Sequence, residues 1–171
     1  MTLVWVDDNY GYIKRLSNPE EQKRSGHAGV YYHLSYLGAP HDYLWLNTTP
    51  PALMYEELKK AYDLGADRYW LLNVGDIKPM ELGVTTFFNM AYDLKKFSFD
   101  NINEYQTDLL CSIYGDKYRK TFQWMLDNYY RLAWSRKPEF MGWEREWDSN
   151  KNLERLGDAK YSFDNHNDAR Y

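Results

Sequence analysis

The segment PALMYEELKKAYDLGADRYWLLNV, residues 51–74, decides the fold class of this chain. Its first part, residues 51–64, has helical spacing, because the apolar positions fall on one face. Thr49 is a suitable N-cap, prolines fit the first turn, and Gly65 can end the helix. Residues 68–74 follow as a short run rich in aromatic and aliphatic side chains, which predicts a strand. A helix that leads directly into a strand is typical of α/β folds.

Two more strands are predicted upstream, at residues 3–6 and 30–36, with a short helix at residues 19–24 between them. Strand–helix–strand units of this length join parallel strands through right-handed crossovers. Residues 1–97 are therefore predicted to be part of a parallel α/β sheet or barrel with about three strands. Three parallel strands leave edges open, so we expect contacts with more protein or with other copies of the chain.

Alternation along the strands assigns side chains to the two faces of this sheet. Val4 and Val6 form the aliphatic face of the first strand, which we expect to meet the covering helices. Asp7 then lies on the other, inward face. His33 and Asn73 are assigned to the inward face of the second and third strands. A satisfied core histidine is the alternative for His33.

Residues 98–171 are predicted to be a helical segment with a polar C-terminal tail from residue 148. Asn101 and Glu104 make a capping box for one helix, which Gly115 ends. Asp116 is expected to cap the next helix, so that the two form an αα-hairpin.

Composition excludes several classes of protein. The 171 residues carry 21 Lys and Arg against 25 Asp and Glu, a net charge of -4, which argues against a nucleic-acid binder. No run of about 18 apolar residues predicts a membrane span. The single cysteine, Cys111, allows neither an internal disulfide nor a cysteine-based zinc site. Tyr, Trp and Phe make up 18% of the chain and suit apolar surfaces that also form hydrogen bonds, such as sugar-binding ones.

Polar residues follow each predicted strand, at residues 7–9, 36–42 and 73–78. The carboxyl ends of parallel strands meet at one edge, where sites of such folds lie. Metal-binding HxxxH and HExxH spacings, a nucleophile elbow and a phosphate loop are missing from the sequence, so no metal and no cofactor are predicted. Carboxylates, aromatic rings and the cations Arg15 and Lys78 suit an anionic sugar. For Asp8, a loop-bracing hydrogen bond is the alternative.

Four blocks in order, WVDDNYGYIKRL (5–16), GVYYHLSYLG (29–38), HDYLWLNTTP (41–50) and LNVGDIKP (72–79), resemble glycoside hydrolase family 115, the xylan α-1,2-glucuronidases. The resemblance covers residues 3–90 and continues with less distinctive motifs through residue 136. It implies an incomplete TIM-type barrel followed by an all-α helical segment. It also implies removal of glucuronic acid or its 4-O-methyl form from xylan with inversion, for which two carboxyl groups stand about 6.5–9.5 Å apart.

By this resemblance, Asp7 and Asp8 are the catalytic candidates. The substrate-binding candidates in the matching blocks and beside them are Asn9, Tyr12, Arg15, His33, Tyr36, Asp42, Asn73, Asp76, Lys78 and Glu81. The sequence departs from the family pattern at Lys14, where Arg is expected, and at Leu37, where a polar or aromatic residue is common. Either change affects substrate fit more than the carboxylates.

The length leads to a further expectation, because 171 residues are too few for a complete eight-fold barrel. We predict a piece of a larger glycoside hydrolase that is inactive by itself and packs on the remaining barrel and helical domains. Glucuronoxylan or its oligosaccharides are the expected substrate, a homo-oligomer is expected, and the parent is expected to be secreted or periplasmic. The alternative is a non-catalytic module that binds carbohydrate or a protein partner.

Overall fold

The computed structural model describes residues 1–37, 44, 46–135, 147–148 and 154–155. Its centre is a parallel sheet of three strands in the order β1-β2-β3. The strands are β1 (Leu3–Val6), β2 (Ala28–His33) and β3 (Tyr69–Asn73). The helices are α1 (Pro19–Gln22), α2 (Pro51–Asp63), α3 (Glu81–Tyr92), α4 (Ile102–Tyr114) and α5 (Arg119–Ser135), and the 3₁₀ turns are η1 (Lys78–Met80), η2 (Leu94–Lys96) and η3 (Asp116–Tyr118). The predicted fold class, a partial α/β barrel followed by helices, is confirmed.

Near the C-terminus, β4 (Trp147–Asp148) and β5 (Glu154–Arg155) form a short antiparallel pair. The other residues of the predicted polar tail lie outside the described part of the chain. Within the described part, no helix combines the length and the apolar character that crossing a bilayer requires.

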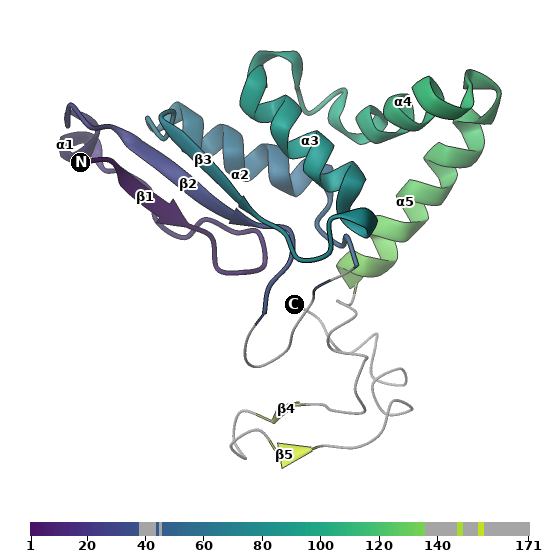
Figure 1. Cartoon of the computed structure of the whole chain (residues 1–171), viewed down its shortest axis with the longest axis horizontal. Helices are drawn as coiled ribbons and strands as arrows, with labels where there is room; N and C mark the ends of the chain where they lie inside the picture. The colour runs from purple at the N-terminus through teal and green to yellow at the C-terminus, as the bar shows by residue number, and fades with distance from the viewer. Residues whose placement is uncertain (38–43, 45, 136–146, 149–153, 156–171) are drawn as a thin grey trace.

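Helices α2 and α3 cover one face of the sheet (Figure 1). The core between them contains Val30, Tyr32 and Leu34 of the second strand and its extension, all fully buried. On the helix side it contains Met54, Leu58, Ala61, Phe87 and Met90. Burial of one large apolar side chain contributes about 1.5–3 kcal/mol, so this layer supplies the main stabilisation of the sheet.

No helix of the described residues covers the other face of the sheet, and here the predicted orientation of the first strand is wrong. Val4 and Val6 are 47% and 50% exposed instead of packing under helices. The register pairs Trp5 with Val30, so Leu3 and Trp5 pack against the core. The Trp5 indole also donates a hydrogen bond of 2.9 Å to the Ser17 hydroxyl, which gives its polar edge a partner on the core side.

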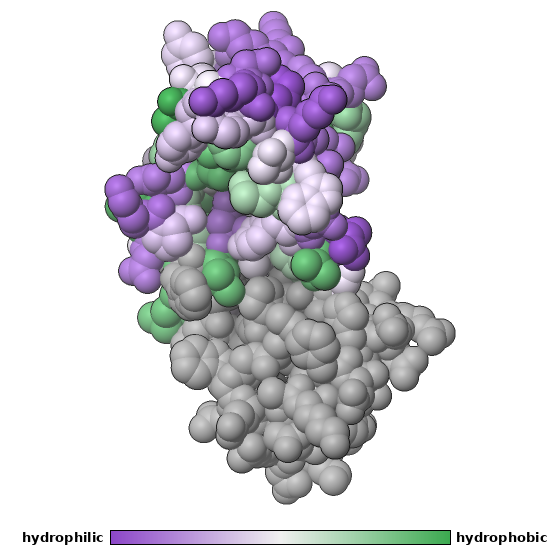
Figure 2. Space-filling view, turned by 90° about the vertical axis from the view of Figure 1, so that its right-hand side faces the viewer, coloured by the Kyte–Doolittle hydropathy of each residue, from purple (hydrophilic) through white to green (hydrophobic). Residues whose placement is uncertain are grey.

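The helical segment packs against the α/β part through buried polar contacts. The Gln106 amide of α4 donates to the Thr86 hydroxyl of α3 at 3.0 Å, and the Tyr130 hydroxyl of α5 donates to Gln106 Oε1 at 2.7 Å. Burial raises the pKa of Tyr130 well above its usual value. On the side of the molecule shown in Figure 2, where α5 lies, polar and apolar residues are interspersed. The predicted domain boundary at residue 97 stays a prediction.

Several local predictions need correction. Strands predicted at 30–36 and 68–74 are shorter and span 28–33 and 69–73, and the helices predicted at 19–24 and 51–64 end at 22 and 63. Pro50, without a side-chain cap, stands at the N-cap of α2 in place of Thr49, which is buried. Asn101 instead accepts from the Ser98 amide and donates to the Lys96 carbonyl, so no capping box forms. Asp116 lies inside η3, whose N-cap is Gly115; that glycine, at φ 102°, ends α4 as predicted.

Candidate active site at the carboxyl ends of the strands

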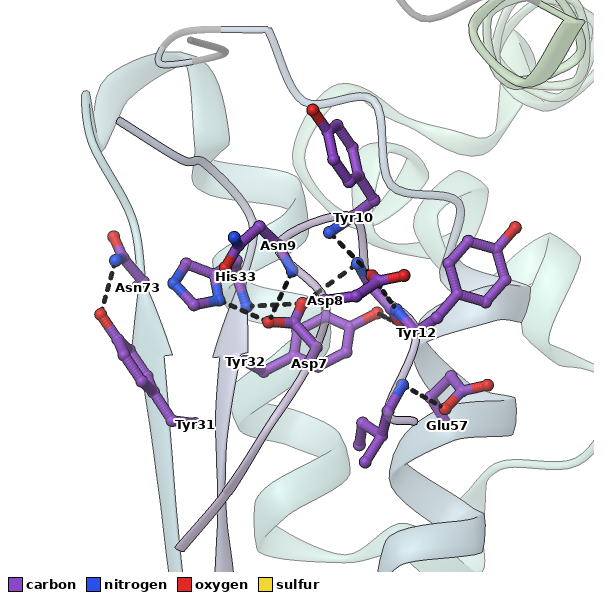
Figure 3. A network of polar contacts seen from close by, with 12 residues as sticks. Asp7, Asp8, Asn9, Tyr10, Tyr12, Tyr31, Tyr32, His33, Glu57 and Asn73 are labelled. Atoms are coloured by element: carbon purple, nitrogen blue, oxygen red, sulfur yellow. Dashed lines mark hydrogen bonds and ion pairs between the residues drawn. The ribbon is translucent and has the colours of Figure 1, made fainter. Parts of the chain in front are cut away.

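Asp7 follows β1 directly, and its carboxylate is enclosed by hydrogen-bond donors (Figure 3). Oδ2 accepts from the backbone amides of Gly11 at 3.0 Å and His33 at 3.3 Å. Oδ1 accepts from the amide of Asn9 at 3.4 Å and lies 2.5 Å from Nδ1 of His33. The Asp7 side chain has no exposed surface, and that of His33 is 5% exposed. This carboxylate therefore ties the loop after β1 to the end of β2.

Asp8 has different surroundings from its neighbour. Its Oδ1 accepts from the amides of Tyr10 and Tyr12, both at 3.1 Å, and its Oδ2 lies 3.1 Å from the Lys14 ammonium. The Asp8 side chain is 28% exposed, so solvent reaches this carboxylate. The hydrogen bonds that brace the loop, the alternative role of Asp8, are therefore present. They use Oδ1, so that Oδ2 pairs with the exposed Lys14.

The loop between Asp7 and Ile13 needs an unusual backbone. Asn9 has φ 70° and Gly11 has φ 92°, both in the left-handed region. A Cβ on Gly11 would stand 2.8 Å from the Tyr32 hydroxyl and 3.1 Å from Leu53 Cδ2. The same Tyr32 hydroxyl donates to the Gly11 carbonyl at 3.1 Å. The glycine is thus required both for its conformation and for close packing.

Glu57 of α2 holds the far end of this loop, and the sequence reading did not identify it. Its buried carboxylate accepts from the Ile13 amide at 2.8 Å and pairs with Lys60 at 2.6 Å. A glutamate inside a helix normally faces water. Burial at position 57 follows from α2 packing beneath the loop, and the one sequence signal for it is its place beside Leu58 of the apolar face.

Tyr12 connects the loop with the helical segment. Its ring centre lies 6.2 Å from that of Trp134 near the end of α5, and the Lys14 ammonium lies 4.7 Å from its centroid. Burial and the nearby Asp8 charge raise the pKa of the Tyr12 hydroxyl. Trp134 is 50% exposed. A ring of this loop and a ring of α5, 122 positions apart in sequence, thus lie next to each other.

Aromatic and amide side chains of β2 and β3 continue the network from His33. The ring of His33 lies between Tyr31, with centroids 4.6 Å apart, and Tyr36, at 5.8 Å and edge-on. The Tyr31 hydroxyl accepts from Asn73 Nδ2 at 2.6 Å. His33 and Asn73 are also register partners of β2 and β3. The ends of all three strands are therefore joined by one set of contacts, as the strand-end argument predicts.

The remaining predicted site residues lie apart from this network. Arg15 pairs with Glu21 at 2.8 Å and stacks over Trp5, 4.7 Å from the ring centre. Lys78 pairs with Glu81 at 3.3 Å in an exposed i,i+3 pair, and Asp76 is also exposed. Asp42 falls outside the described residues. Among the described residues, no group of three or more His, Cys, Asp or Glu side chains is placed to hold a metal ion. The roles predicted for individual site residues stay predictions.

Comparison of the chain with known proteins identifies its family. Residues 1–140 match the description Glycosyl hydrolase family 115. The chain is similar to the solved structure of BtGH115A, described as a novel 4-O-methyl-α-glucuronidase of that family with specificity for decorated arabinogalactans. The identity is 48% and the TM-score 0.79, over 87% of this chain and 20% of that one, so the chain spans about a fifth of its solved relative. A search of curated proteins finds no match. The chain belongs to glycoside hydrolase family 115.

Proposed function

We propose that the protein containing these residues is an α-glucuronidase that removes glucuronic acid, or its 4-O-methyl form, from xylan-type or related decorated polysaccharides. Family membership and the 48% identity to a 4-O-methyl-α-glucuronidase support the substrate class. The observation that carries the proposal is the Asp7–Asp8 pair at the carboxyl end of a parallel strand, where one carboxylate is enclosed and the other is open.

In the proposed reaction, the glycosidic bond is hydrolysed with inversion of the anomeric carbon. One carboxyl group protonates the leaving oxygen while another removes a proton from the attacking water. Asp8 is the carboxylate that meets the substrate, because its side chain is 28% exposed and its Oδ2 is paired only with the exposed Lys14 in the described contacts. Lys14 supplies a positive charge that also attracts the carboxylate of a uronic acid.

The prediction that Asp7 is itself an acid or base rests on the resemblance alone. Its contacts favour a positioning role, since both of its oxygens already accept hydrogen bonds. The second carboxyl group of an inverting pair then comes from another part of the protein.

The test is hydrolysis of glucuronoxylan and of a decorated arabinogalactan by the purified whole protein that contains these residues. The released acid is identified by chromatography and its anomer by proton NMR. Asp8→Asn should lower kcat by at least about 100-fold, because a proton-transfer group is lost. Asp63→Asn, at the end of α2 and paired only with Lys59 in the described contacts, is the matched control. An Asp8→Asn enzyme with wild-type kcat would contradict the role of Asp8.

Two further expectations belong to this proposal. Residues 1–171 alone should be inactive, because no helix of the described residues covers the sheet face beside the site and the chain spans a fifth of its relative. Release of glucuronic acid by this chain would contradict that. Xylan and arabinogalactan are too large to cross a membrane, so we place the protein outside the cytoplasm, secreted or periplasmic. The open sheet face and edges favour contacts with more barrel or with a second copy.

Sugar binding without catalysis is the second candidate, and the exposed Trp134 beside Tyr12 favours it. Aromatic faces of this kind stack on sugar rings. The wild-type assay separates the two functions, because a binding module would bind the polysaccharide without turnover, and Asp8→Asn would leave its affinity unchanged.

A further inference from the structure

The contact between Asp7 and His33 is the shortest one that the loop after β1 makes with β2, and it points to a specific role for both residues. We infer that Asp7 is a positioning residue that fixes the tautomer of His33, so that His33 Nε2 accepts a hydrogen bond from a hydroxyl of the bound sugar. This inference rests on the proposed function for its ligand, while the pair itself rests on the geometry.

The acceptor role of Asp7 follows from its donors. Three of the four groups that contact its carboxylate are backbone amides, of Asn9, Gly11 and His33, which only donate. Both oxygens are therefore acceptors, and the fourth group, Nδ1 of His33, must carry the proton in the 2.5 Å contact. In a neutral imidazole, a protonated Nδ1 leaves the lone pair on Nε2.

The free end of this imidazole is directed to the strand ends. Nε2 points away from Asp7, toward the side where Tyr31 and Asn73 lie (Figure 3). Among the residues that the structure describes, none forms a hydrogen bond with it, although His33 is 4% exposed. The imidazole is thus bound on its Nδ1 side, while its Nε2 side faces the candidate site, where a ligand hydroxyl can donate to it.

The surroundings of the ring favour a sugar hydroxyl as that ligand. Tyr31 and Tyr36 hold the ring from two sides, so it has little freedom to turn. Asn73, the register partner of His33, uses its amide nitrogen for the Tyr31 hydroxyl, which leaves its oxygen as a second acceptor. Two neighbouring acceptors match the hydroxyl donors of a pyranose better than its carboxylate, which can only accept.

Two substitutions at His33 separate the inferred role from a structural one. His33→Asn keeps a donor near the Nδ1 position and removes the outer nitrogen, whereas His33→Gln places an amide near the Nε2 position and loses the bond to Asp7. We expect His33→Asn to lower kcat/KM about 10- to 100-fold, mainly through KM, and His33→Gln to retain more activity. If the histidine only braces the loop, His33→Gln is the worse variant, and that order overturns the inference.

Asp7→Asn tests the tautomer directly. Its amide oxygen should face the amides of Gly11 and His33, so its NH₂ group faces Nδ1, which must then accept. The proton moves to Nε2, which no longer accepts. Carbon-13 NMR of labelled histidine distinguishes the two tautomers, with His33→Asn identifying the signal. We expect an Nδ1–H form in the wild type and an Nε2–H form in Asp7→Asn.

The two proposals fail in different ways. If the wild-type protein releases no glucuronic acid from either polysaccharide, the proposed function fails. Titration of glucuronic acid into the labelled protein still tests the inference, which requires a shift of the His33 signal. An Nε2–H tautomer in the wild type, or wild-type kcat/KM in His33→Asn, overturns the inference while leaving the glucuronidase proposal intact.

Discussion

The loops after β1 and after β3 look alike in sequence and differ in structure. The first combines two aspartates, and the second one aspartate, with a glycine and a lysine directly after a strand. In the loop after β1, Asp7 is enclosed and Gly11 is packed under Tyr32. In the loop after β3, Asp76 is exposed, and the Lys78 and Glu81 side chains are 92% and 62% exposed. The first loop is held by two buried carboxylates, Asp7 and Glu57. The second loop is held by its backbone amides, since Gly75 donates to the buried Ser35 hydroxyl and Asp76 to the Leu44 carbonyl, while its charged side chains are exposed.

Among substitutions in the two loops, Gly11→Ala is expected to lower the free energy of unfolding most. The substitution places a Cβ 2.8 Å from the Tyr32 hydroxyl at a φ of 92° and should lower the free energy of unfolding by about 2–4 kcal/mol. Gly115→Ala is the control, because its φ is 102° but no atom lies within 4 Å of the added Cβ. Urea denaturation should show a loss of about 1 kcal/mol there. Equal losses at both positions would mean that packing at Gly11 contributes nothing.

Glu57→Gln should cost less, about 1–3 kcal/mol, because a buried carboxylate that accepts from the Ile13 amide becomes a weaker acceptor. Glu56→Gln, exposed on the same helix, serves as the matched variant and should leave the urea midpoint unchanged. Hydrogen exchange at the Ile13 amide should accelerate in Glu57→Gln alone. Unchanged exchange would show that this contact does not hold the loop.

Tyr32→Phe removes the hydroxyl that donates to the Gly11 carbonyl at 3.1 Å, and we expect a loss of about 1 kcal/mol. Combined with Gly11→Ala, it should relieve part of the clash, since the hydroxyl is the atom nearest to the added Cβ. A double variant less stable than the sum of the single changes would contradict this geometry.

The smallest effect is expected in the loop after β3. Lys78→Met should leave the thermal midpoint unchanged within error, because its exposed pair with Glu81 is screened by solvent. A shift of several degrees would show that this loop is as constrained as the one after β1, and would remove the contrast between them.

The positions of helix α2 and of the three strands of the sheet were predictable from the sequence, and that of helix α3 was not. The α2 helix and the first strand follow from their spacing and from the residues that bound them. Helix α3 was not expected, because Gly83 and the β-branched Val84–Thr86 run lower its helix propensity. Burial of Phe87 and Met90 against the sheet stabilises it instead.

The orientation of β1 could not be predicted, because its four residues are apolar on both faces. Pairing of Trp5 with Val30 decides which face meets the core, and pairing is a long-range property. The residues of the candidate site also divide into those that local sequence predicts and those that long-range contacts decide. Positions such as Asp7, His33 and Asn73 are predictable from the meeting of strand ends, whereas Glu57 depends on a contact with Ile13, 44 residues away.

The hydrogen bond between Thr86 and Gln106 spans the predicted boundary at residue 97, and the contact of Tyr12 with Trp134 does the same at the site. Chimeras that exchange the helical part between relatives at this boundary would mix both pairs. A chimera with its first 97 residues from one parent and its helices from another must keep residue types that still form both contacts, at the four positions Thr86, Gln106, Tyr12 and Trp134. Otherwise the contacts between the two parts, including that at the candidate site, are lost. The loop after β1 and helix α5 must therefore come from the same parent protein, although 122 positions separate Tyr12 from Trp134.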